Sequence, residues 1–218
     1  MATGYNLRNK NKNDILIMKK EEKDKLIMGL DVSTTCTGIA LFLDKGDHGR
    51  LLELTHVSPI IKPKMENKHN EMMLKSDVFK EYIKKYKGLG IYRVIIEEPL
   101  LYSNNIHTVG TLTKFNGLIS RVVYDELGVM PEYINTYDAR SYAFPELVAP
   151  GKSGKPVLFG GLPMDVDKKM VIWEKVKELH PQLEWTRDAK GKLKKETFDM
   201  SDSVAVVYGM MHKEGKWK

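Results

Sequence analysis

The sequence predicts an α/β domain in which helices flank a five-stranded mixed sheet. Three short apolar or alternating runs, at 26–31, 36–43 and 51–58, are separated only by turn-length gaps. This spacing is typical of three consecutive antiparallel strands. Two later apolar runs each follow a helix-length segment, which predicts strands joined in parallel by helical crossovers. The predicted order is three strands, a helix, a strand, a helix, a strand and two further helices.

The first two helices and the strand between them are predicted from periodicity and glycines. Residues 66–86 and 104–127 place apolar side chains at helical spacing, and glycines at 88–90 and at 128 follow these segments. Glycine is a common helix terminator because it adopts the left-handed conformation without strain. The intervening run IYRVIIEE is rich in isoleucine, which predicts a strand that is buried on both faces.

The second half of the sequence predicts one more strand and two helices. Pro131–Thr136 is interpreted as a short fifth strand. The segment 141–165 is interpreted as an insertion loop, because it is rich in proline and glycine and its apolar residues show neither the helical nor the strand period. Asp165 or Asp167 is expected to cap the third helix. The final helix is expected from about 199 to 213.

Length and composition limit the class of protein. A chain of 218 residues can bury one substantial core, so one domain is expected over 25–218, after a basic and flexible arm over 1–24. The single cysteine, Cys36, excludes an intramolecular disulfide. No apolar run approaches the roughly 20 residues that span a bilayer, and no signal-peptide pattern is found. We therefore expect a soluble, cytoplasmic protein that does not associate with a membrane.

The charge of the chain favours a polyanionic partner. The formal net charge is +6, and lysine and arginine gather in the N-terminal arm, in GKSGKP and in TRDAKGKLKKE. These segments are interpreted as loops or tails. The alternative is that their basic residues are ordinary solvated surface and bind no polyanion. The last of them makes Lys192, Lys194 and Lys195 candidates for contacts with a nucleic-acid backbone.

Four acidic residues at long sequence separations are the strongest indication of function. Asp31 and Glu97 each end a hydrophobic run that predicts a buried strand, and Asp199 and Asp202 lie at the start of an apolar helix. A carboxylate beside a buried strand must be hydrogen-bonded, paired or metal-bound to offset its desolvation. Carboxylates are also the ligands that Mg²⁺ prefers, so the pattern predicts a metal site.

Each of these acids has an alternative interpretation. Asp199 could be a helix N-cap, and Asp202 could lie on an exposed helix face. Glu98 competes with Glu97, because adjacent residues of a strand point to opposite faces.

Four motifs in this order resemble the RNase H-like superfamily and, within it, the RuvC-type Holliday junction resolvases. The motifs are GLDVSTTCTGIAL, IIEEP, PEYINTYDAR and DMSDSVAVVYGMM, and the resemblance covers about residues 26–213. It implies an RNase H-like fold and a site that holds two Mg²⁺ ions, with Mn²⁺ as a substitute. Asp31 would bridge the ions, Glu97 would hold one, and Asp199 and Asp202 would complete the set. Mutual repulsion of the acids implies weak folding without metal.

The resemblance also implies roles for several other residues. Lys168, with Lys169 as its alternate, matches a helix-borne lysine that approaches the scissile phosphate. Tyr102 lies near the position where the family carries an aromatic residue that stacks on or wedges a junction base, although Pro99, Leu100 and Leu101 depart from the family pattern. Asp138 and Arg140 would orient the lysine helix or contact backbone phosphate.

The function implied is that of a metal-dependent endodeoxyribonuclease, a homodimer that nicks branched DNA without a nucleotide cofactor. One alternative is an RNase H-like nuclease that acts on RNA–DNA hybrids or flaps. Another is an actin-like ATPase or sugar kinase, which GLDVSTTCTGIAL also resembles. Such proteins duplicate the domain and carry a second Asp-Gly phosphate motif, which we do not find. The GKS at 151–153 is not a Walker A loop, because Glu146 stands where the first glycine belongs.

Overall fold

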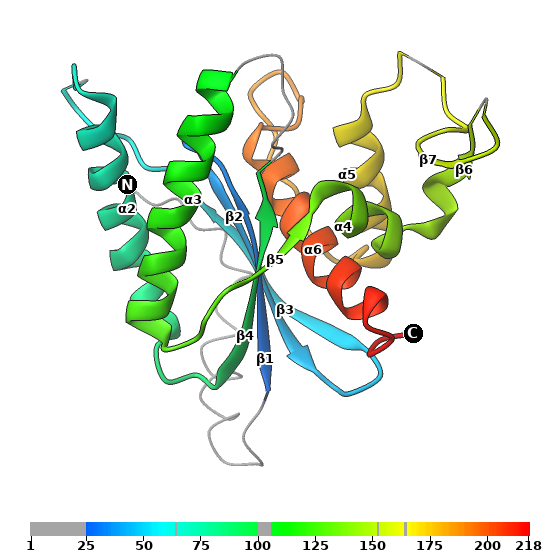
Figure 1. The fold of residues 1–218 in the computed structure, drawn as a ribbon, viewed down its shortest axis with the longest axis horizontal. Helices are drawn as coiled ribbons and strands as arrows, with labels where there is room; N and C mark the ends of the chain where they lie inside the picture. Colours follow the sequence, from blue (N-terminus) through cyan, green and yellow to red (C-terminus); the bar gives the residue numbers. More distant parts are fainter. Residues whose placement is uncertain (1–24, 64, 100–105, 152, 164) are drawn as a thin grey trace.

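A five-stranded sheet forms the centre of the molecule (Figure 1). The computed structural model describes residues 25–63, 65–99, 106–151, 153–163 and 165–218, so the predicted arm lies outside the described residues. The strands are β1 (Leu26–Val32), β2 (Thr37–Asp44), β3 (Gly49–Val57), β4 (Ile91–Glu98) and β5 (Glu132–Asn135). Their order is β3-β2-β1-β4-β5, in which β1, β2 and β3 pair antiparallel while β4 pairs parallel with β1 and β5. The predicted fold class is confirmed.

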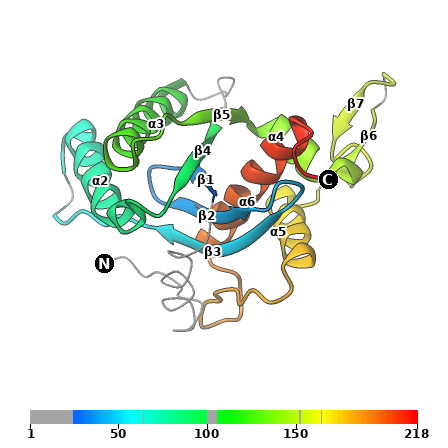
Figure 2. The same ribbon diagram turned by 90° about the horizontal axis from the view of Figure 1, so that it is seen from below.

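Helices cover both faces of the sheet, as the two views in Figures 1 and 2 show. One face is covered by α2 (Lys68–Ile83), which continues into the short 3₁₀ helix η2 (Lys84–Tyr86), and by α3 (Ile106–Leu127). The other face is covered by α4 (Thr136–Ala143), α5 (Lys168–Leu179) and α6 (Glu196–Lys213). The sheet therefore separates two apolar cores.

Alternation along the central strands decides which core each side chain enters. In β1, Met28 and Leu30 pack with α2 and α3, whereas Ile27 packs with α6. In β4, Ile96 faces α3 and Ile95 faces α6. Because the period of a strand is two, every second residue of both strands is directed toward α6.

Two glycines allow α6 to lie unusually close to the sheet. A Cβ atom at Gly29 of β1 would lie 2.3 Å from the carbonyl oxygen of Ser203. A Cβ atom at Gly38 of β2 would lie 2.0 Å from the carbonyl oxygen of Asp199. Any side chain at either position would displace the helix, so both glycines help to set the position of the first turns of α6.

The structure corrects two expectations for the second half of the chain. The segment 141–165 is not a structureless insertion: it contains the end of α4, a 3₁₀ turn at Pro145–Leu147, and a hairpin of β6 (Val148–Pro150) and β7 (Pro156–Leu158). Three-residue strands bounded by proline are too short to show alternation. Helix α6 begins at Glu196 rather than near 199, while the predicted cap of α5 is confirmed at Asp167, which accepts from the backbone N–H of Lys169.

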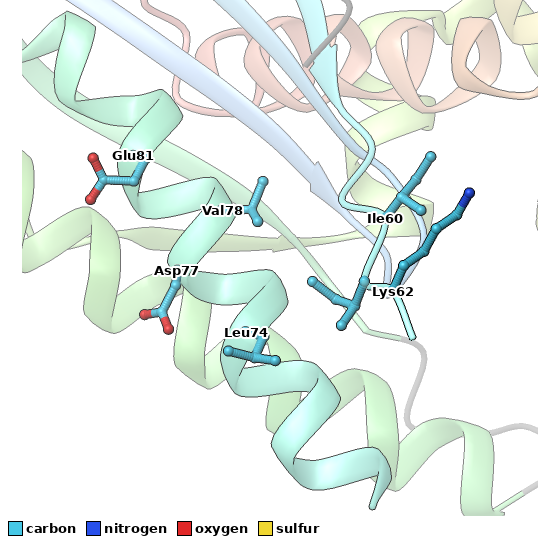
Figure 3. A pocket seen from close by; sticks show the side chains of 7 residues that line it. Ile60, Lys62, Leu74, Asp77, Val78 and Glu81 are labelled. Carbon is cyan, nitrogen blue, oxygen red and sulfur yellow. The ribbon is translucent and has the colours of Figure 1, made fainter. Parts of the chain in front are cut away.

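A pocket of about 410 Å³ lies between α2 and the segment that follows β3. Figure 3 shows Leu74 and Val78 of α2 on one side and Ile60 on the other. None of the four predicted site acids lines this pocket. It is therefore separate from the site described next.

Candidate metal centre

Asp31 and Glu97 lie at the same edge of the sheet and on the same face. Each is the next-to-last residue of its strand, and β1 and β4 are parallel, so their carboxyl ends coincide. Strand alternation places Asp31 in phase with Gly29, and Glu97 in phase with Ile95. Both acids are therefore directed toward α6. Glu98 is in phase with Ile96, which faces the opposite core.

Helix α6 supplies the third acid of a compact cluster. Carboxylate oxygens of Asp31, Glu97 and Asp202 all lie within 4.8 Å of one another. Asp202 is only 3% exposed, so it is not an acid of a solvated helix face. The three residues come from three elements that are far apart in sequence, and such an oxygen-rich group suits a hard divalent cation.

Asp199 lies beside this cluster but outside it. Its Oδ1 is 3.5 Å from Nζ of Lys169, and the thiol of Cys36 donates a hydrogen bond to its carboxylate. Asp199 belongs to the first turn of α6, and the N-cap is Lys195, so the N-cap alternative for Asp199 is wrong. The contact with Cys36 could not be expected from the sequence, where a lone cysteine suggests only a small buried residue.

The structure distinguishes the two lysine candidates of α5. Lys169 faces the acids through its contact with Asp199, whereas Nζ of Lys168 lies 5.8 Å from the centre of the Phe159 ring. Of the two, Lys169 is the lysine that contacts one of the predicted site acids. Lys169 precedes the buried Ile172 and Trp173 by three and four residues, so it shares the inner face of the helix.

Arg140 of α4 is part of the carboxylate cluster rather than the exposed surface. Its Nη2 donates to Oδ1 of Asp202 at 2.9 Å, and its side chain is only 14% exposed. Asp138, expected to act with it, instead binds Nζ of Lys213 at 2.6 Å. The expectation that Arg140 contacts backbone phosphate directly does not fit this buried position.

The remaining candidates divide between exposed and undescribed residues. Lys192, Lys194 and Lys195 are all exposed, and they lie in or next to a short hairpin before α6 that is closed by a bridge between Arg187 and Leu193. Tyr102 lies outside the described residues.

Burial and mutual repulsion perturb the acids of the cluster. Burial raises the pKa of Asp31 well above its usual value, and the negative charges of Glu97 and Asp202 raise it further. Burial, followed by the charge of Asp202, raises the pKa of Glu97 to about 7, although Arg140 and a hydrogen bond from Thr136 act in the opposite direction. Burial also raises the pKa of Asp199. Carboxylates held in this way are typical of functional sites.

The cluster has an excess of negative charge that a divalent cation would neutralise. The three acids of the cluster and the adjacent Asp199 face the two cations Arg140 and Lys169, which leaves two formal negative charges when all four acids are ionised. The residues present therefore fit a divalent ion. Asp31, Glu97 and Asp202 would hold it, and Asp199 is adjacent.

Comparison of the structure with solved structures finds the same fold in Holliday junction resolvases. RuvC of Thermus thermophilus has a TM-score of 0.52 and 15% identity, covering 88% of this chain and 97% of that chain. The T. thermophilus RuvC in complex with a Holliday junction substrate has a TM-score of 0.56 and 12% identity, with 88% and 95% covered. Ydc2, the yeast mitochondrial Holliday junction resolvase, has a TM-score of 0.58 and 10% identity, with 92% and 83% covered.

The chain has a RuvC-like fold. Identities this low establish the fold alone. Comparison of the sequence with family models and with curated proteins finds no match. Among the described residues, no helix is both long and apolar enough to cross a membrane.

Proposed function

We propose that this chain is a divalent-metal-dependent endonuclease that cuts branched DNA, most specifically four-way junctions. The observation that supports this best is the convergence of Asp31, Glu97 and Asp202 within 4.8 Å, at the edge of a sheet with a RuvC-like fold. Carboxylates with uncompensated negative charge can bind the divalent ions that assist hydrolysis of a phosphodiester.

The residues of the site have distinct proposed roles. Asp31, Glu97 and Asp202 would hold Mg²⁺, or Mn²⁺ in its place, which would supply stabilisation of negative charge during hydrolysis of a phosphodiester. Lys169 contacts Asp199 and its side chain is 51% exposed. We propose that it contacts the scissile phosphate. The binding of two ions per site remains a prediction. Asp199, which lies outside the compact cluster, would be a ligand of the second ion.

We propose that affinity for DNA comes from the basic surface rather than from the acids. Lys192, Lys194 and Lys195 are exposed near the start of α6, the helix that carries two of the site acids. Contacts between such lysines and phosphates release counterions, so binding should weaken steeply as salt is raised. They carry no information about base sequence.

We also propose that the chain acts as a homodimer, because paired nicks on a near two-fold junction require two sites related by a two-fold axis. Sedimentation or light scattering of the DNA-free protein tests this directly. A location in the cytoplasm stays a prediction of the composition.

A panel of substrates tests the proposed function. Matched four-way junction, flap, linear duplex and RNA–DNA hybrid are incubated with the protein and Mg²⁺, with Mn²⁺, or with chelator. We expect paired nicks in the junction that require metal. Preferential cleavage of the hybrid would move the protein to an RNase H-type activity, and no metal-dependent cleavage of any substrate would contradict the proposal.

A further inference from the structure

The carboxylate cluster already contains a cation that belongs to the protein. The guanidinium of Arg140 lies 2.9 Å from Oδ1 of Asp202, and its side chain is 14% exposed while that of Asp202 is 4% exposed. Arg140 also interacts favourably with the charges of Glu97 and Asp31. One buried arginine therefore opposes the charge of all three acids that form the candidate metal site.

The surroundings of Arg140 fix it in this position. Its helix, α4, packs against α6, and a Cβ atom at Gly209 of α6 would lie 2.2 Å from the carbonyl oxygen of Ala139. The approach of the two helices at this glycine places residue 140 against Asp202. Nη2 of Arg140 donates to Asp202, whereas Nε is, among the described residues, a buried nitrogen without a hydrogen-bond partner.

We infer that Arg140 is a resident counter-cation, a positioning residue that keeps the three carboxylates assembled before metal binds and limits how tightly they bind it. This inference rests on the proposed metal site. Without an opposing charge, three carboxylates within 4.8 Å of one another would repel and separate. With Arg140 in place, the metal-free site can stay folded, but an incoming divalent cation meets a positive charge beside its ligands.

The inference has two consequences of opposite sign. Neutralising Arg140 should destabilise the metal-free protein, because it leaves buried acids without their partner. The same change should tighten binding of a divalent cation, because repulsion between the arginine and the ion disappears. A purely structural arginine would give the first effect without the second.

The test compares Arg140→Gln with Arg121→Gln in the full chain at pH 8, first with chelator and then titrated with Mn²⁺. Arg121 is the matched control, since it is 71% exposed in an ion pair with Asp125 on the surface of α3. We expect the melting temperature of metal-free Arg140→Gln to fall by on the order of 10 °C. We expect its Mn²⁺ affinity, measured by calorimetry, to rise about tenfold. Arg121→Gln should change neither quantity.

Two further variants keep the test decisive if Arg140→Gln does not fold. Arg140→Lys retains the charge and should restore both properties most of the way. Combining Arg140→Gln with Asp202→Asn removes both partners and should recover stability that the single variant loses. Unchanged or weaker Mn²⁺ binding by Arg140→Gln, with normal binding by the wild type, would overturn the inference alone. No Mn²⁺ binding by the wild type would overturn the proposed metal site as well.

Discussion

Strand β4 and helix α6 carry two charged clusters with different balances of charge. Near the start of β4, Arg93 is 5% exposed and binds Glu132 of β5 at 2.6 Å and Glu214, the C-cap of α6, at 2.7 Å. Lys216 also binds Glu214, at 2.8 Å, so two acids meet two cations. Near the end of the same strand, Glu97 belongs to the cluster of three acids, and Asp199 lies beside it as a fourth. Among the described residues, the cations that contact these acids are Arg140 and Lys169.

The difference between the clusters separates stability from function. The Arg93 cluster is neutralised within the protein, so it can fasten α6 to the sheet without a ligand. The carboxylate cluster is left with uncompensated charge at the edge of the sheet, which is unfavourable for folding and useful only if a cation binds there. Variants at the two ends of β4 should therefore have opposite effects on stability and activity.

The largest effect is expected from Glu97→Gln, with Glu98→Gln as its control. Removal of one metal ligand should lower the rate of junction cleavage on the order of a thousandfold, equivalent to about 4 kcal/mol. The metal-free variant should nevertheless melt at a higher temperature than the wild type at pH 8, because one repelling charge is gone. Glu98→Gln should cleave within about twofold of the wild type. The reverse ranking of the two variants would assign the ligand to Glu98.

The opposite result is expected from Arg93→Ala. Loss of the buried Arg93 leaves Glu132 without its partner and leaves Glu214 with Lys216 alone. Because both carboxylates remain partly exposed to water, the free energy of unfolding should fall by about 3 kcal/mol in urea denaturation. Cleavage measured well below the melting temperature should stay close to that of the wild type. A loss of activity in a fully folded Arg93→Ala protein would show that the two clusters are not independent.

A smaller effect is expected from the two lysines of α5. Lys169→Ala should slow cleavage about a hundredfold, by about 2.7 kcal/mol, because it removes the cation that contacts Asp199. Lys168→Ala should change the rate less than threefold, since Lys168 lies over Phe159. Single-turnover rates on saturating junction separate this effect from weakened binding. Equal losses in the two variants would contradict the assignment of Lys169.

The smallest and most general effect is the pH dependence of stability without metal. The pKa of Glu97 is raised to about 7, so its contribution to stability is present below the ordinary glutamate pKa of about 4.3 and is lost as pH rises through 7. The pKa of Glu214 is lowered to about 2 by its bonds with Arg93, so its contribution is present above about 4.3 and is lost toward pH 2.

The metal-free protein should therefore be most stable near pH 4.5, where both contributions are almost fully present. Urea denaturation across pH 2–9 with chelator measures this maximum, and Mg²⁺ should reduce the loss on the alkaline side only. Stability that rises steadily from pH 5 to pH 8 in chelator would refute the account of the carboxylate cluster.

Three of the four acids named from the sequence, Asp31, Glu97 and Asp202, lie together in the structure, and Asp199 lies beside them. Asp31 and Glu97 each end a continuous hydrophobic run that predicts a buried strand, and Asp199 and Asp202 are three residues apart on one predicted helix. The choice of Glu97 over Glu98 agrees with the geometry, because strand alternation directs only one of them to α6. The close approach of α6 depends on Gly29 and Gly38, whose importance becomes visible only when the helix is placed.

The sequence does not predict what the cations do. Arg140 lies in a stretch where α4 has only eight residues, too few to reveal a buried face, and its partner Asp202 is 62 residues away. The partners of Arg93 are 39 and 121 residues away. Lys168 and Lys169 are adjacent, and the sequence does not show which of them lies on the side of α5 that faces the acids unless the start of the helix is known. Ion pairs between residues that are far apart in the sequence therefore could not be predicted from it.

The most direct test of the central claim is to measure binding and cleavage of one four-way junction by the wild type and by Asp31→Asn, in Mg²⁺. Asp77→Asn, a change at an exposed aspartate of α2, serves as the control. Our account predicts that Asp31→Asn binds the junction as tightly as the wild type and no longer cuts it, while Asp77→Asn does both. Cleavage by folded Asp31→Asn at the wild-type rate would contradict the assignment of this cluster as the active site.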